Sequence, residues 1–214
     1  MAQAKSFSDD PIEQVSNWVQ VNRKVLLYGA ISLGAAGAAI LVYRSTTAST
    51  QANASTALYE AQAPLNQGNL SAAQTELQKV VTRYGSTLSG QQATILLAQV
   101  LYDQKQYDAG ISALEKARAG ASPDFRATME AMMAVGYEYQ GKLDKAADQY
   151  AKAASAARFD GERSGYLASQ ARTLQAAGQL VESKALWEQL VLEDGTATSQ
   201  EARVRLGEIA GAGK

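Results

Sequence analysis

One long uncharged run lies near the N-terminus. Val25 to Tyr43 are nineteen consecutive residues without a charge, and only Ser32 interrupts an otherwise small or apolar stretch. As an α-helix this run spans about 28 Å, close to the roughly 30 Å hydrocarbon core of a bilayer. Tyr28 and Tyr43 suit the two headgroup levels. The pattern predicts one transmembrane helix over residues 25–43.

Two other interpretations of the run are weaker. A cleaved signal peptide would use the "GAAGAA" stretch, but cleavage there leaves "ILVYR" at the new N-terminus. It also requires a long leader that contains Asp9, Asp10 and Glu13. A buried core helix requires equally apolar neighbours, and no other segment of the sequence is as apolar. We therefore expect an uncleaved anchor.

The basic residues around the run predict its orientation. Lys5, Arg23 and Lys24 precede it, whereas only Arg44 follows before Lys79. The more positive flank normally stays in the cytoplasm. We therefore expect a cytoplasmic N-terminus and an exported C-terminal part, which is periplasmic in a bacterium with two membranes.

The segments that flank the anchor have distinct compositions. Before it, Asp10 and Pro11 form a helix-start signal for a short amphipathic helix. After it comes a small, polar spacer, either extended or weakly helical. The predicted division is a tail (1–24), an anchor (25–43), a spacer (44–54) and a repeat domain (55–214).

Small residues recur every four positions within the anchor, at Ala30, Gly34 and Ala38. Such a face lets a partner helix approach closely. The alternative is that these residues simply fill an anchor.

A repeat dominates the rest of the sequence. Similar segments begin at Glu60, Leu97, Met133 and Gln170, with steps of 37, 36 and 37 residues. The second and third, "LAQVLYDQKQYDAGISALEKA" and "MAVGYEYQGKLDKAADQYAKA", align without a gap. A fixed step of this size is typical of a solenoid of stacked helical hairpins.

Equivalent positions in the repeat carry residues of similar size. Two columns are small, as expected where the helices of a hairpin cross closely: Ala61, Ala98, Ala134 and Ala171, then Ala73, Gly110, Ala146 and Ser183. Two columns are large: Leu70, Tyr107, Leu143 and Leu180 begin the second helices, and Leu77, Leu114, Tyr150 and Trp187 fill their middles. Between the helices, Gly68, Gly141 and Gly178 predict left-handed stops, and Lys105 departs from this pattern.

These patterns predict an all-α protein. Its N-terminal transmembrane helix is followed by an α-solenoid of about four hairpins and a C-terminal capping helix at "SQEARVRLGEIAG". Pro64 falls inside the first helix of the first hairpin, so we expect this helix to kink or end early.

The composition argues against several classes of function. The sequence contains no Cys and no His, so we expect no disulfide, no His-based triad or His-liganded metal site, no cofactor and no enzymatic activity. Residues 45–214 hold 16 Lys and Arg against 18 Asp and Glu, with the signs interspersed. Nucleic-acid binders usually carry a basic stripe, so we expect no nucleic-acid partner.

The repeat resembles the tetratricopeptide repeat, most closely in the second and third segments. The complete layout, with the tail "DPIEQVSNWVQVNRK", a Gly/Ala-rich anchor and this repeat domain, is similar to the YfgM-like family of bacterial inner-membrane proteins. That resemblance implies an accessory role at the protein translocon, in association with a membrane-anchored periplasmic chaperone.

A solenoid of hairpins presents a concave groove lined by the first helix of each unit, and such surfaces bind protein segments. The repeat register places these residues in the groove: Ile95, Gln99, Tyr102, Ala131, Val135, Glu138, Tyr139, Arg172 and Gln175. Packing of the two tyrosines against the next helix is the alternative. We expect membrane or periplasmic protein partners, either as a translocon-associated scaffold or as a structural subunit of another large membrane complex, such as a respiratory or photosynthetic one.

Overall fold

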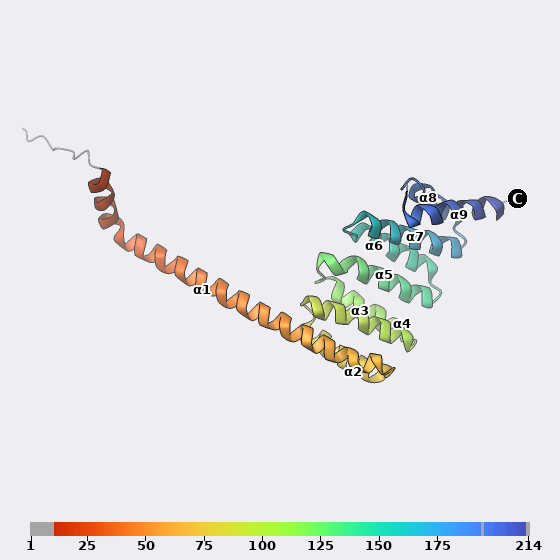
Figure 1. Ribbon diagram of the computed structural model, residues 1–214, viewed down its shortest axis with the longest axis horizontal. Helices are drawn as coiled ribbons and strands as arrows, with labels where there is room; N and C mark the ends of the chain where they lie inside the picture. Colours follow the sequence, from red (N-terminus) through yellow and green to blue (C-terminus); the bar gives the residue numbers. More distant parts are fainter. Residues whose placement is uncertain (1–10, 194, 213–214) are drawn as a thin grey trace, which may run out of the picture. The chain divides into compact units, whose positions relative to one another are not determined.

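The computed structural model describes residues 11–193 and 195–212, and every regular element in these ranges is a helix (Figure 1). The helices are α1 (Pro11–Asn66), α2 (Leu70–Tyr84), α3 (Leu88–Asp103), α4 (Tyr107–Arg118), α5 (Pro123–Tyr139), α6 (Leu143–Ala156), α7 (Asp160–Ala176), α8 (Leu180–Leu190) and α9 (Ala197–Ala212). The chain divides into two compact units, Met1–Ser49 and Thr50–Lys214. The predicted all-α class is confirmed.

The described part of the first unit is a single stretch of α1. Its most apolar window is entirely exposed, and among the described helices α1 alone is long and apolar enough to cross a membrane. The hydroxyls of Thr46 and Thr47 donate back to the carbonyls of Val42 and Tyr43, at 3.0 and 2.8 Å, so they are satisfied within the helix. The predicted spacer is helical, and Asp10, which belongs to the predicted helix-start signal, lies outside the described residues.

The second unit is a stack of antiparallel hairpins (Figure 1). The last turns of α1 pair with α2, and α3–α4, α5–α6 and α7–α8 form three further hairpins. Helix α9 packs against α7 and α8, and Ala202 buries its side chain completely in that contact. Four hairpins and a capping helix are therefore present as predicted.

The repeat register agrees with the packing. Helices α2, α4, α6 and α8 begin at the four predicted large residues, and both small columns are buried. The Ser183 hydroxyl donates to the carbonyl of Ala171 at 2.8 Å, which joins the two small columns directly. Trp187, the largest residue of its column, is fully buried one turn further along α8. Small residues at the crossings thus let the large ones fill the space between the helices.

All four links within hairpins adopt the same left-handed turn. Gly68, Gly141 and Gly178 have φ of 71°, 69° and 81°, and Lys105 has φ of 63°. The N–H of the following residue returns to the last turn of the first helix, as in the 2.7 Å bond from Gln106 to the carbonyl of Leu101. Lys105 therefore adopts the same left-handed conformation although it is not a glycine.

Pro64 does not end the first hairpin's helix early. Helix α1 continues to Asn66, two residues before its left-handed stop, and the other first helices end at the same distance from theirs. The prediction of an early end was wrong. The carbonyl of Pro64 instead accepts the link bond from the Asn69 N–H at 2.9 Å.

Candidate protein-interaction surfaces

Tyr102 does not line a groove. Its side chain is 3 % exposed, and its hydroxyl donates to the carbonyl of Met132 at 3.0 Å. The ring fills the space left by two glycines, because a Cβ on Gly110 or Gly136 would lie 2.4 or 2.5 Å from the tyrosine. Burial raises the pKa of the Tyr102 phenol, and the nearby Tyr137 adds to the shift. For this tyrosine the packing alternative is correct.

Glu138 and Arg172 brace neighbouring helices. The Glu138 carboxylate accepts bonds from the hydroxyls of Tyr150 and Thr173, at 3.1 and 2.6 Å, and so ties α5 to α6 and α7. Burial, followed by the charge of Glu138, raises the pKa of the Tyr150 phenol. Arg172 forms a forked pair with Glu201, at 2.9 and 2.8 Å, and so fastens α7 to α9. These side chains contribute to the stack, although each keeps some exposed surface.

Tyr139 is the predicted groove residue that offers the most apolar surface, because 55 % of it is exposed. Its ring stacks on Tyr107 with centroids 5.4 Å apart and meets the edge of Tyr102 at 6.0 Å. Gln99 is also exposed and donates to Asp103 at 3.1 Å. The other predicted groove residues are partly buried: Ile95, Ala131, Val135 and Gln175.

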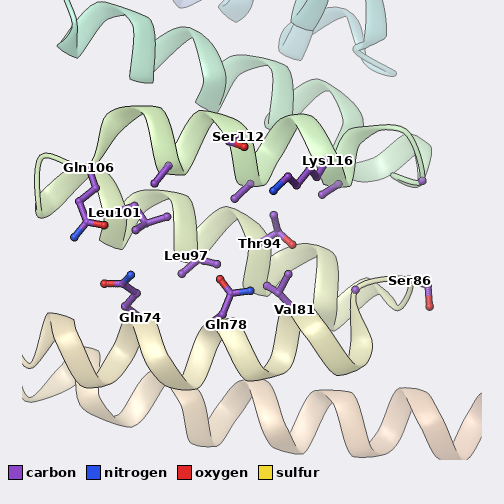
Figure 2. Close-up of a pocket in the computed structure, with 15 residues that line it drawn as sticks. Gln74, Gln78, Val81, Ser86, Thr94, Leu97, Leu101, Gln106, Ser112 and Lys116 are labelled. Atoms are coloured by element: carbon purple, nitrogen blue, oxygen red, sulfur yellow. The ribbon is translucent and has the colours of Figure 1, made fainter.

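A recess lies on the side of the second helices. It encloses about 670 Å³ between α2 and α4, over a floor formed by α3 (Figure 2). We call it the α2–α4 groove. Its lining residues are Gln74, Gln78, Val81, Gly85, Ser86, Thr94, Leu97, Leu101, Gln106, Ala109, Ser112, Ala113, Lys116, Ala117 and Gly120.

Three kinds of surface meet in the α2–α4 groove. Leu97 and Leu101 lie beneath the groove and are only 1 % and 5 % exposed, and α4 contributes a wall of alanine and serine side chains. Gln74 and Gln78 point from α2 toward the gap, and Lys116 reaches in from α4 (Figure 2). Among the described residues that line the groove, Lys116 alone carries a charge.

Sequence reasoning missed this groove because it looked only at the first helices. The available signal was the run of small residues at Ala109, Ser112, Ala113 and Ala117, which leaves one face of the second hairpin without bulk. By itself that run is also compatible with close packing against another helix. The repeat does not distinguish the two outcomes.

The small-residue face of the anchor lies on α1 within the first unit. Ala30, Gly34 and Ala38 are exposed, and a Cβ built on Gly34 meets nothing within 4 Å. The described chain therefore leaves this face uncovered. Its role in binding a partner helix stays a prediction.

Comparison with known proteins agrees with this architecture. The family model of the tetratricopeptide repeat-like domain matches residues 28–175, more than half of the chain. The chain belongs to this family. Proteins of this fold are typically interaction modules without enzymatic activity. No curated protein matches the sequence.

Solved structures share the fold at low sequence identity. The TPR-like repeats of a protein described as a kinesin light chain of Podosopora anserina superpose with a TM-score of 0.60 at 18 % identity, covering 76 % of this chain and 88 % of theirs. A tetratricopeptide repeat protein from Parabacteroides merdae gives a TM-score of 0.59 at 12 % identity, with 74 % and 60 % covered. These similarities establish the fold alone.

Proposed function

We propose that this protein is a membrane-anchored protein-interaction module. The observation that carries the proposal is one chain that joins an exposed apolar helix of membrane-spanning length to a tetratricopeptide-like solenoid. The helix would hold the solenoid at a bilayer through residues 25–43, and the solenoid would bind membrane or periplasmic proteins. The described residues of the solenoid supply surfaces for such recognition.

The proposed location is the bacterial inner membrane, with the N-terminus in the cytoplasm and the solenoid in the periplasm. The support is the excess of basic residues before the apolar run. A reporter that is active only outside the cytoplasm should work when fused after Lys214 and fail when fused after Asp10. The opposite pattern would rule out this orientation and any periplasmic partner.

The proposed partner is the protein translocon, where the solenoid would act as an accessory scaffold associated with a chaperone. This assignment rests on the resemblance of the tail, anchor and repeat to the YfgM-like family. The full-length tagged protein, extracted in mild detergent and purified, should retain translocon subunits identified by mass spectrometry. Recovery of a respiratory or photosynthetic complex instead would favour a structural subunit of that complex.

The binding face can be tested on the same extract. Tyr139→Ala removes an exposed aromatic side chain from the predicted concave groove, and aromatic residues often dominate interface energies. The double change Gly34→Leu and Ala38→Leu instead blocks close helix approach at the anchor. Partner loss on Tyr139→Ala alone supports the groove. Loss on the anchor change alone supports the structural-subunit alternative.

A further inference from the structure

We infer that the α2–α4 groove binds an extended polypeptide segment of about five residues, in which small apolar side chains flank an acidic one. The inference rests on the proposed function as a protein-interaction module and names a second surface and the chemistry of its partner. The length of the groove, the repeat register and the polar groups each support it.

The length of the groove fits a short extended chain. Along the wall formed by α4, the lining runs from Gln106, directly before the helix, to Ala117, a helical rise of about 16 Å. Five residues of an extended chain cover about the same distance.

The next gap along the solenoid, between α4 and α6, carries an ion pair at the equivalent positions, and the recess that remains beside it on α5 and α6 is smaller, about 500 Å³. One repeat step takes Thr94 to Glu130 and Val81 to Arg118. There the buried Glu130 carboxylate accepts a bond from the Arg118 guanidinium at 3.2 Å. No such pair exists in the α2–α4 groove, whose corresponding side chains are short and carry no charge.

The wall formed by α4 also differs from its counterpart on α6. The small residues Ala109, Ser112 and Ala113 of α4 correspond to Lys145, Asp148 and Gln149 of α6. At these positions the α2–α4 groove thus has shorter, uncharged side chains than the α4–α6 gap, on both walls and on the floor. The recess of about 500 Å³ at the next repeat step is instead lined by the charged residues Arg126, Glu130 and Lys152.

The charge of the groove selects an acidic partner. Lys116 is exposed and forms no ion pair with another described residue, and no carboxylate lines the groove among the described residues. Figure 2 shows its side chain reaching along the groove between Ser112 and Thr94. Because Lys116 projects from a wall rather than closing an end, it suits an Asp or Glu side chain within a continuous segment.

The glutamines of α2 suit the backbone of that segment. An extended chain outside a sheet carries unpaired N–H and C=O groups, and each glutamine amide offers both a donor and an acceptor. Gln74 and Gln78 lie one helical step of four residues apart, about 6 Å, which approximates the repeat of two residues in an extended chain. Both therefore can pair with backbone groups that face the same way.

The test uses the full-length protein in detergent micelles and three pools of acetylated, amidated heptapeptides, Ser-X-X-Z-X-X-Ser. X is Ala, Val or Leu, and Z is Glu, Gln or Lys. The Glu pool should be retained about fivefold more than the Lys pool, as expected for one partly desolvated ion pair. Lys116→Glu should reverse this preference. Lys152→Glu, the same change at the equivalent position of the next repeat, should leave it unchanged.

A second variant closes the groove with the protein's own filling pair. Val81→Arg with Thr94→Glu copies Arg118 and Glu130 into the α2–α4 groove and should reduce retention of all three pools, at unchanged helicity. Equal retention of the three pools by the unmodified protein overturns the inference. So does an equal response to Lys116→Glu and Lys152→Glu, or stronger retention of a helical peptide of the same composition.

This outcome is separable from that of the proposed function. Partners that co-purify with the full-length protein and persist after Lys116→Glu would leave the interaction module intact and reject the groove as their site. Peptide retention without any co-purified partner would support the groove and reject the proposed interaction module.

Discussion

Helix α4 forms one wall of two gaps that differ sharply. Toward α2, its alanine and serine side chains face an open groove of about 670 Å³. Toward α6, the gap contains the Arg118–Glu130 pair, and Glu130 is only 7 % exposed. The two gaps have the same register and the same backbone plan, and the recess that remains on the α6 side is smaller, about 500 Å³, so side-chain volume at a few positions decides how much of a gap stays open. A repeat can therefore keep its fold while one of its surfaces becomes a candidate binding site.

The largest expected effect compares the floors of the two gaps. Met133 and Leu97 are equivalent in the repeat and are 0 % and 1 % exposed. Met133→Ala should cost about 3–5 kcal/mol of unfolding free energy, because its cavity is enclosed. Leu97→Ala should cost about 2–3 kcal/mol, because its space opens into the groove and fills with water. Urea denaturation followed by circular dichroism measures both changes, with Met133→Leu as a volume-conserving control. A larger loss for Leu97→Ala would mean that the groove is closed in solution.

A second comparison adds volume instead of removing it. Ala146 is fully buried at a helix crossing, so Ala146→Leu should overpack the third hairpin and cost about 1–3 kcal/mol. Ala113 lines the α2–α4 groove, so Ala113→Leu should change stability by less than about 0.5 kcal/mol. Thermal unfolding of the two variants checks the difference. Equal destabilisation would contradict either the repeat register or the openness of the groove.

The ion pair in the α4–α6 gap gives a third prediction. Arg118→Met leaves the buried Glu130 carboxylate without its cation and should cost about 1–2 kcal/mol, a modest figure because Arg118 keeps 41 % of its side chain exposed. Arg118→Val combined with Glu130→Thr should recover most of that loss, since the unpaired charge is gone. Arg163→Met, at an exposed pair with Asp160, is the control and should have almost no effect. A double variant that is no more stable than Arg118→Met would show that the pair is not coupled.

The smallest effect concerns the turns that begin the two second helices on either side of the α4–α6 gap. Lys105 and Gly141 occupy equivalent left-handed turns, with φ of 63° and 69°. Lys105→Gly should stabilise the protein by about 0.5–1 kcal/mol, because it relieves the steric cost of a Cβ in this conformation. Gly141→Ala should destabilise it by about 1 kcal/mol for the same reason. Thermal unfolding measures both, and an unchanged midpoint for Lys105→Gly would show that Lys105 carries no strain.

The concave face was only partly predictable. Helical periodicity correctly places Tyr139 on an exposed face, yet the same periodicity placed Tyr102 beside it. Tyr102 is buried because Gly110 and Gly136, on two other helices, leave room for its ring. A pattern within one helix does not report the volume that its neighbours leave free. The status of the remaining groove residues as a binding stripe stays a prediction.

The sequence by itself determined the periodic parts of this protein. The apolar run, the step of 36 or 37 residues, the first residues of the second helices and the left-handed stops all depend on local propensity or on the spacing of large and small residues. Such features arise within one or two helices, so they can be recognised along the chain.

Only the tertiary structure decided what fills the space between hairpins. Two hydrogen bonds, from Tyr102 to Met132 and from Thr173 to Glu138, join residues about one repeat apart. The open groove likewise lies between residues about one repeat apart, Gln78 and Ser112. Close packing makes each of these depend on the summed volumes of side chains from three helices. No single segment contains that sum, which is why the same repeat holds an ion pair with a buried carboxylate on one side of α4 and an open groove on the other.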